Sequence, residues 1–277
     1  MVGALEARGL VFEYAGDDAG PVRALDGVDL RVADGELLVV IGPNGSGKST
    51  LLRCLGGLAR PRAGMVALRG RELGAYAGRG RAREIAMVPQ YLPALPDVLV
   101  AEFVMGGRYA HLGRWSGPAA VDRRAVDLAL AAADVSTLRQ RLMTELSGGQ
   151  RQRVLVARAL AQEARVFLVD EPTASLDPEH QIHVFQLISR TVAQARAAVV
   201  VTHDLNLASQ FATRLALMDG GRLVAEGPVG EVLRREVLEP VYGSALHFGT
   251  LRQADGSRRP FVLPWAGGQF EDDSPST

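Results

Sequence analysis

The stretch Gly42-Pro43-Asn44-Gly45-Ser46-Gly47-Lys48-Ser49, with Thr50 after it, decides the fold of this 277-residue chain. It fits the pattern G-x-x-x-x-G-K-[ST], in which glycines let backbone N–H groups turn inward around phosphate oxygens. An unbroken apolar run, Leu37 to Ile41, precedes it, and a helical pattern from Lys48 to about Leu58 follows it. A buried strand, a glycine-rich turn and a helix together predict a phosphate-binding loop in an α/β domain.

Lysine occurs at one position only, Lys48, although the chain has 31 basic residues. Arginine does not replace lysine where a compact ammonium on a flexible stem is needed, so this usage points to a specific role. We expect Lys48 to reach the β- and γ-phosphates of a nucleotide and the Ser49 hydroxyl to bind Mg²⁺. Thr50 is expected to add a phosphate contact, so residues 42–50 form the predicted nucleotide-binding loop.

A second, acidic motif follows another apolar run, Val166 to Val169. Asp170 stands at the carboxyl end of this predicted strand, which is the edge at which α/β sheets bind ligands. We expect Asp170 to orient Mg²⁺ and its waters, and Glu171 to polarise the attacking water as general base. In the same chain as the phosphate-binding loop, this pair predicts nucleotide hydrolysis rather than a simple turn before Pro172.

Composition limits the classes to which the chain can belong. Hydrophobic residues make up 47%, so we expect a globular protein, and the formal net charge of zero gives no general argument for binding to nucleic acid or to an anionic membrane surface. The single cysteine, Cys54, cannot form an internal disulfide, which fits a reducing compartment. No apolar run approaches the ~18 residues of a membrane span, and Met1 to Leu10 lacks a signal-peptide core. Any work at a membrane is therefore expected from the cytosol and through a partner.

The hydropathy pattern indicates an α/β core with an insertion. Apolar runs at 37–41, 166–169 and 198–202 alternate with helical patterns, which predicts a doubly wound parallel sheet. Residues 91–155 are instead rich in alanine and leucine at helical spacing, which predicts an inserted helical subdomain. We expect one domain over 1–266 and a disordered tail over 267–277.

Further motifs, taken with these two, resemble those of the ABC ATPase family. Leu146-Ser147-Gly148-Gly149-Gln150 resembles the family's signature sequence, and its Ser147 hydroxyl and glycine amides at a helix start would form an anion site. Gln90 follows a predicted strand as the Q-loop glutamine does, Ser175-Leu176-Asp177 resembles the D-loop, and His203 resembles the switch histidine. The resemblance covers about 10–242, nearly the whole chain.

Tyr14 resembles the aromatic residue of the A-loop, which stacks on adenine in that family. Phe12 lies on the same face of the predicted strand, and aromatic residues in strands more often belong to the core. Both interpretations of Tyr14, as an adenine contact and as a core residue, therefore remain open at the level of sequence.

The resemblance implies a P-loop NTPase (RecA-like) core with an N-terminal antiparallel β subdomain and an inserted α-helical subdomain. It implies ATP hydrolysis with ATP and Mg²⁺ bound, the catalytic residues being Lys48, Gln90, Glu171 and His203 and the metal ligands Ser49, Gln90 and Asp170. It also implies that two copies of the chain sandwich two ATP molecules, the residues offered across the dimer being Ser147, Gly148, Gly149, Gln150 and Asp177.

Segments outside these motifs resemble the ATPases of metal-chelate importers, which carry iron-siderophore complexes, haem or cobalamin. The segments are Val104 to Tyr109, Asp204 to Ala208, Gly227 to Leu233 and Glu239 to Gly243, whereas Leu99-Val100 departs from the Thr-Val pair that is more usual there. This resemblance implies integral-membrane permease subunits as partners, indirectly a substrate-binding protein, and a peripheral position at the cytoplasmic face of the cell membrane.

Other ABC machines remain as alternatives. A zinc or manganese importer has the same core motifs. A soluble ABC ATPase of DNA repair or translation is a third class, but the chain lacks the long coiled coil or basic linker of those proteins and a basic stripe for nucleic acid. Exporter motors are often fused to a membrane span, which this sequence does not contain.

Two local patterns outside the catalytic motifs allow a structural interpretation. Phe103 and Met105 would either form an apolar groove for a helix of the membrane subunit or pack inside the helical insertion. Arg79, Arg81 and Arg83 form a basic cluster before a predicted strand, and we expect a solvated loop there.

Overall fold

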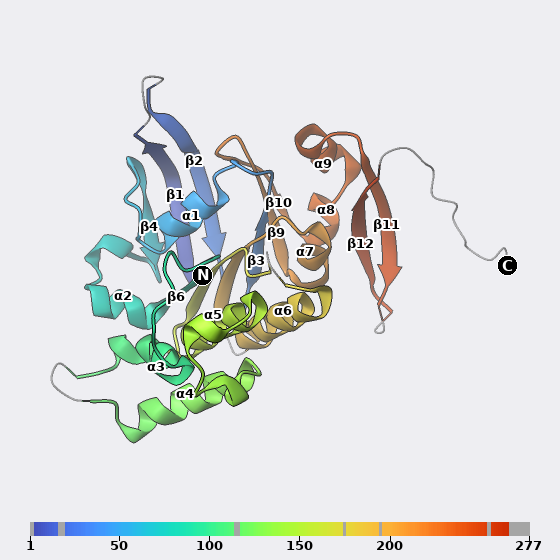
Figure 1. The fold of residues 1–277 in the computed structure, drawn as a ribbon. Coiled ribbons are helices and arrows are strands. Elements are labelled where there is room, and N and C mark those ends of the chain that lie inside the picture. Colours follow the sequence, from blue (N-terminus) through green and yellow to red (C-terminus); the bar gives the residue numbers. More distant parts are fainter. Residues whose placement is uncertain are drawn as a thin grey trace.

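The computed structural model describes residues 3–15, 20–113, 117–173, 176–193, 196–253 and 256–265. The expected tail over 267–277 lies outside the described residues. A six-stranded sheet of order β10-β9-β3-β8-β7-β6 forms the centre (Figure 1). Its five parallel strands are β3 (Leu37–Ile41), β6 (Ile85–Val88), β7 (Val166–Asp170), β8 (Ala197–Val201) and β9 (Arg214–Asp219). The antiparallel β10 (Arg222–Gly227) closes one edge.

A smaller antiparallel sheet of order β2-β1-β4-β5 forms the N-terminal part. Its strands are β1 (Leu5–Tyr14), β2 (Val22–Val32), β4 (Ala63–Leu68) and β5 (Arg71–Glu72). Buried residues of this sheet and of α1 (Lys48–Leu55) pack with Leu38, Val40 and Val199 on one face of the six-stranded sheet. That face is therefore covered by α1 and the N-terminal sheet.

Helices cover the opposite face of the six-stranded sheet. Val39, Ile41 and Val200 pack there with side chains of α5 (Gly148–Ala161), α6 (Pro178–Val192) and α7 (Leu205–Phe211). Since β3 and β8 are buried at every position, both faces of these strands need apolar residues, which explains their unbroken apolar runs. The predicted α/β core, N-terminal antiparallel subdomain and helical insertion are confirmed, while the limits 1–266 and 91–155 stay predictions.

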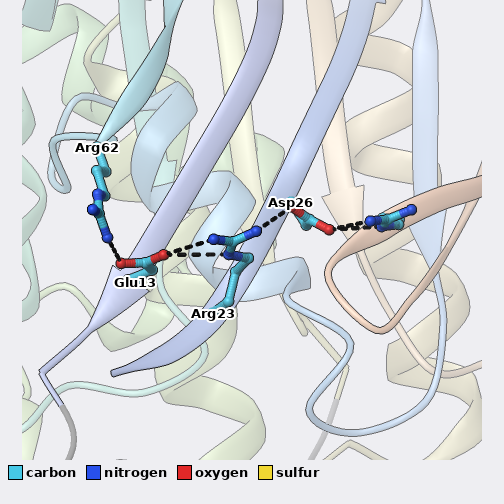
Figure 2. Close-up of polar contacts among 5 residues, drawn as sticks. Glu13, Arg23, Asp26 and Arg62 are labelled. Carbon is cyan, nitrogen blue, oxygen red and sulfur yellow. Dashed lines mark hydrogen bonds and ion pairs between the residues drawn. The ribbon is translucent and has the colours of Figure 1, made fainter. Parts of the chain in front are cut away.

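A chain of ion pairs crosses the open side of the N-terminal sheet (Figure 2). Arg62 pairs with Glu13 on β1, Arg23 joins Glu13 to Asp26 on β2, and Asp26 also accepts from Arg222 at the start of β10. The Arg62 hydrogen bond holds the pKa of the Glu13 carboxyl below its usual range, and the Arg222 hydrogen bond does the same for Asp26. The arginines are exposed and the two carboxylates only partly buried, so these pairs connect the two sheets rather than stabilise them strongly.

The helical insertion contains α3 (Val100–Met105), a 3₁₀ turn (Gly106–Ala110) and α4 (Ala120–Ala132), which pack on α5. Arg108 is buried at its centre, where its Nε donates to Asp122 Oδ1 at 3.0 Å and its Nη1 donates to Ala161 O at 2.8 Å and Glu163 Oε2 at 2.6 Å. One side chain thus joins the 3₁₀ turn to the start of α4 and the end of α5.

The structure shows where Phe103 and the arginine cluster at 79–83 lie. Phe103 is 6% exposed and packs inside the insertion beneath Arg158, whose guanidinium lies 4.5 Å from the ring centroid, so it does not line an exposed groove. The expected arginine-rich loop is wrong, because 78–84 form helix α2 (Gly78–Glu84). Arg83 Nε donates to Ala110 O at 2.9 Å, which holds α2 against the insertion.

The C-terminal part consists of α8 (Val229–Val232), α9 (Arg235–Tyr242) and a hairpin of β11 (Leu246–Arg252) and β12 (Arg258–Pro264). The Asn206 amide on α7 holds this hairpin, since its Nδ2 donates to Val262 O at 3.0 Å and its Oδ1 accepts from Val262 N at 2.9 Å. Across the described residues, every helix is too short or too polar to cross a membrane.

The buried arginine of the insertion gives a stability prediction. Arg108→Leu would leave Asp122 charged and unpaired in a buried position, so we expect the free energy of unfolding to fall by about 3–5 kcal/mol. Arg139→Leu is the matched control, because its pair with Asp127 is about half exposed on both sides and contributes less than about 1 kcal/mol. Urea unfolding followed by circular dichroism measures both changes. Equal losses in the two variants would contradict the assigned role of Arg108.

Candidate functional site

The phosphate loop packs so closely on other backbones that two of its positions require glycine. A Cβ on Gly47 would lie 2.3 Å from Ala24 O on β2, and a Cβ on Gly42 would lie 2.2 Å from Met218 O on β9. Both glycines also have positive φ values, 100° and 151°. The turn Gly220-Gly221 between β9 and β10 adds a further contact, because Gly221 N donates to Ser46 O at 3.1 Å. The loop is therefore held from both sheets.

Lys48 lies inside the loop and is buried. Its Nζ donates to Gly42 O and Pro43 O, both at 2.8 Å, and to Ser46 Oγ at 3.4 Å. Burial lowers the pKa of Lys48, while the carboxylates of Glu171 and Asp170 act to raise it. Helix α1 begins at Lys48 without a side-chain cap and without an acidic residue in its first turn, so its first N–H groups are open to an anion.

Ser49 and Asp170 meet at the carboxyl ends of β3 and β7. Ser49 Oγ donates to Asp170 Oδ1 at 3.0 Å. Burial raises the pKa of Asp170, against the effects of the Ser49 hydrogen bond and of the Lys48 charge. A hydroxyl and a carboxylate are hard oxygen donors of the kind that Mg²⁺ prefers, so this pair fits a magnesium ion beside bound phosphates.

Glu171 is buried and has a positive φ of 44°. Its N–H donates to Val201 O on β8 at 3.0 Å, and its Oε2 lies 2.8 Å from His203 Nδ1. A backbone in this region is strained for a residue with a side chain, and such strain persists only where the surroundings fix it. Glu171 and His203, which are far apart in the sequence, are thereby brought into one hydrogen-bonded pair.

Tyr14 lies at the end of β1 beside the phosphate loop. Its hydroxyl is 3.0 Å from Thr50 Oγ1, so β1 touches the start of α1. The Phe12 ring packs edge-on against it with a centroid distance of 4.9 Å, yet Tyr14 remains 39% exposed. Tyr14 is therefore not a core residue, and its aromatic ring is partly exposed at the edge of the phosphate loop.

The signature segment forms the N-terminus of α5. Ser147 caps the helix by a reciprocal pair of bonds, since its Oγ accepts from Gln150 N at 3.2 Å and Gln150 Oε1 accepts from Ser147 N at 3.1 Å. Gly148 lines a cavity of about 230 Å³ together with Gln90 and Glu171. Gln90 and the start of α5 are thus on the Glu171 side of the site. The cavity has no lining residue from the phosphate loop 42–50, all of which the structure describes.

Asp177 caps α6, where its Oδ1 accepts from His180 N at 3.0 Å. Ser175, the first residue of the expected D-loop, lies outside the described residues. Leu176 is buried, and a Cβ on Gly149 would lie 3.2 Å from its Cδ2. The D-loop segment and the signature segment therefore touch within one chain.

A second hollow, of about 300 Å³, lies between α1, α2, β6 and α5. Leu58, which is 62% exposed, and Met87 form part of its apolar wall, and Arg81 and Arg158 form part of its polar wall. Pro89 and Leu92, on either side of Gln90 and Tyr91, also line it. This hollow, here called the Leu58 groove, is adjacent to the Q-loop.

Sequence reasoning missed several residues that shape the site. The turn at Gly220-Gly221 was recognisable as a hairpin signal, but its contact with Ser46 connects parts of the chain 175 positions apart in sequence. Ala24 acts only through its carbonyl oxygen, which no side-chain pattern reports.

Comparison with known proteins gives consistent matches. Residues 25–174 match the family described as "ABC transporter". The hemin import ATP-binding protein HmuV of Bradyrhizobium diazoefficiens is 41% identical over 254 residues, which cover 89% of this chain and 91% of that protein.

Two solved structures have similar folds. A chain from the inward-facing structure of a protein assigned to the metal-chelate type of ABC transporter superposes with a TM-score of 0.81 at 28% identity, covering 96% of this chain and 98% of that one. A dimeric ATP-binding cassette in a post-hydrolysis state, bound to ADP and phosphate, gives a TM-score of 0.73 at 28% identity over 81% of this chain and 98% of that one.

The close packing of the loop gives a prediction at two glycines. Gly47→Ala would drive its Cβ into the Ala24 carbonyl, so we expect a loss of about 3 kcal/mol or more in the free energy of unfolding. Gly45→Ala is the matched control, because Gly45 also has a positive φ, 81°, but no atom lies within 4 Å of the added Cβ. Strain alone predicts a loss of about 1–2 kcal/mol there. Chemical denaturation of both variants measures the difference, and equal losses would contradict the packing argument.

Proposed function

Because the chain belongs to the ABC transporter family, whose ATP-binding subunits hydrolyse ATP, we propose that it is the motor of an importer for a metal chelate. The chelate would be an iron–siderophore complex, haem or cobalamin. The similarity to a hemin import protein over nearly the whole chain and to a metal-chelate type transporter supports this class. The observation that carries the motor role is the hydrogen-bonded pair Glu171–His203 next to the pair Ser49–Asp170.

Hydrolysis would proceed with a water placed against Glu171. A buried carboxylate that is oriented by a histidine suits a general base, since it can accept the proton of the attacking water. His203 would hold the carboxylate and contact the γ-phosphate through its exposed ring, which is 63% accessible. Lys48 would exchange contacts with the loop carbonyls for contacts with the β- and γ-phosphates.

The same site has oxygen donors for a magnesium ion. Ser49 and Asp170 would hold Mg²⁺, and Gln90, which is exposed at the rim of the neighbouring cavity, would complete the set. The ion neutralises developing charge on the transferred phosphoryl group. Tyr14 would stack on the adenine ring, because its open face lies beside Thr50 at the edge of the phosphate loop.

A second copy of the chain would complete each ATP site. The α5 N-terminus offers Ser147, Gly148 and Gly149 as an anion site, and the cavity that Gly148 lines has no lining residue from the phosphate loop 42–50 of its own chain. Gln150 and Asp177 would lie with it at the contact between copies, and the dimeric cassette with bound ADP and phosphate supports such an assembly. Two ATP molecules would then lie between two chains that close on binding and reopen after hydrolysis.

The Leu58 groove would receive a segment of a membrane-embedded permease. It is partly apolar, it is rimmed by Arg81 and Arg158, and it borders the Q-loop, so an amphipathic helix with an acidic end would fit it. This partner would hold the chain peripherally at the cytoplasmic face of the membrane, with a substrate-binding protein on the other side. The groove thus replaces Phe103 as the proposed contact.

Purification with partners and reconstitution tests the function as a whole. The tagged chain, isolated from native membranes in mild detergent, should carry a polytopic permease identified by mass spectrometry. The complex in proteoliposomes should take up haem, cobalamin or a ferric siderophore in an ATP-dependent way. Uptake of zinc or manganese instead would show that the importer carries metal ions rather than metal chelates. Purely soluble partners would contradict the proposed role in transport.

The general-base assignment gives a prediction for Glu171→Gln. We expect this variant to bind ATP normally, to lose at least about 100-fold in turnover, and to accumulate as a dimer with ATP and Mg²⁺. Lys48→Ala is the comparison, because it removes the phosphate contact itself and should bind no ATP and stay monomeric. ATPase assays and size-exclusion chromatography distinguish the two. Normal turnover in Glu171→Gln would remove the assignment.

The groove gives a prediction for Leu58→Glu. A new carboxylate on an apolar wall should abolish co-purification of the permease while nucleotide binding by the isolated chain stays unchanged. Leu128→Glu is the matched control, because Leu128 on α4 is 61% exposed, compared with 62% for Leu58, and lies outside the groove. If both variants retain the permease, the groove is not its docking site.

A further inference from the structure

A hollow of about 280 Å³ lies between the end of α4, α5 and α6, and it is here called the α5–α6 hollow. Its polar lining consists of Asp134, Arg153, His183, Gln186 and Arg190. None of the described residues that line it belongs to the phosphate loop, to the acidic pair after β7 or to the switch histidine. The hollow is therefore separate from the nucleotide site, and the proposed function gives its basic side chains no role.

Arg153, on the second turn of α5, has only one part of its guanidinium paired. Its Nη1 donates to Asp134 O and to Asp134 Oδ2, both at 3.1 Å. Its Nε has less than 1 Å² of accessible surface and finds no acceptor among the described residues, and within that part of the chain its Nη2 makes no hydrogen bond either. Nε and Nη2 form an edge of the guanidinium that can bind two oxygens of one anion. Arg153 thus has an unused pair of donors.

Helix α6 adds two basic groups on the other side of the hollow. His183 and Arg190 lie seven residues apart on this helix, which is about two turns, so they share one face. Arg190 has no hydrogen bond or ion pair with any residue that the structure describes. Asp134 is the one carboxylate among the described lining residues, and it already binds Arg153. Positive charge therefore exceeds negative charge around the hollow, which favours an anion.

We propose that the α5–α6 hollow is a second anion site, which takes a small oxyanion of the phosphate type. A tetrahedral oxyanion presents oxygens in several directions, so one ion would accept from Arg153 on α5 and from Arg190 on α6. A carboxylate has two oxygens in one plane and suits a single guanidinium edge better.

An ion in this hollow would join two helices that begin at functional segments. Helix α5 begins after Ser147 of the signature segment, and α6 begins after Asp177 of the D-loop. The bound ion would hold the two arginines together, which otherwise carry like charges on one hollow. The packing of the signature helix on the D-loop helix would then depend on the concentration of the anion. This role goes beyond the proposed function and does not depend on it.

Equilibrium dialysis with radiolabelled inorganic phosphate tests the site in the full-length chain. Saturating Mg²⁺ and a non-hydrolysable ATP analogue keep phosphate out of the phosphate loop, and chloride keeps the ionic strength constant. We expect one phosphate bound per wild-type chain. Arg190→Gln removes one charged donor from an exposed position, so it should weaken phosphate binding about tenfold or more.

Arg124→Gln is the matched control, because Arg124 on α4 is also exposed and without a partner among the described residues but lies outside the hollow. It removes the same charge and should leave phosphate binding unchanged. The proposal is overturned if both variants weaken binding equally, if Arg190→Gln binds phosphate as the wild type does, or if the wild type binds none. Acetate that displaces phosphate at equal concentration would overturn the phosphate class. Failure of the ATP analogue to bind would instead contradict the proposed function and leave the comparison of variants valid.

Discussion

The phosphate loop packs backbone against backbone on two other strands, and the rest of the site depends on this contact. Gly47 lies where any side chain would collide with the Ala24 carbonyl on β2, and Gly42 lies where one would collide with the Met218 carbonyl on β9. Because the hairpin turn at Gly221 also bonds to the loop, the loop is fixed by both sheets together. The N-terminal sheet is therefore part of the scaffold that shapes the phosphate site, and the ion pairs on its open side connect it to the central sheet.

Adjacent carboxylates acquire different roles because the backbone turns sharply between them. Asp170 still belongs to β7 and points to Ser49, at 3.0 Å, whereas Glu171 has a φ of 44° and points to His203, at 2.8 Å. In a regular strand, neighbouring side chains would simply alternate between the two faces of the sheet. The strained residue, held by its bond to Val201 O on β8, instead brings a second carboxylate to the same edge. In the proposed function, one carboxylate would then serve a metal ion and the other a water molecule.

The sequence predicted those elements that a local pattern of residue types is sufficient to determine. Buried parallel strands need unbroken apolar runs, so Leu37–Ile41 was predicted with its observed limits. The first half of β1 was missed, because Gly9 has a φ of 56° at an irregularity of the pairing and interrupts the alternation. Helix α2 was missed because its arginines and glycines have no apolar period, and it is held by contacts such as that of Arg83 with Ala110 O. Such contacts across the fold leave no trace in a local pattern.

Helix α5 connects the two surfaces that the proposed function requires. Its N-terminus carries Gly148 on the cavity of Glu171, and its later turns carry Arg158 on the wall of the Leu58 groove. A helix of 14 residues spans about 21 Å and transmits displacement as a rigid rod. Arg108 donates to Ala161 O at the C-terminal end of α5, so this end of the helix is joined to the helical insertion. In the proposed function, a partner at the groove wall and a nucleotide at the α5 N-terminus would therefore act on the same helix.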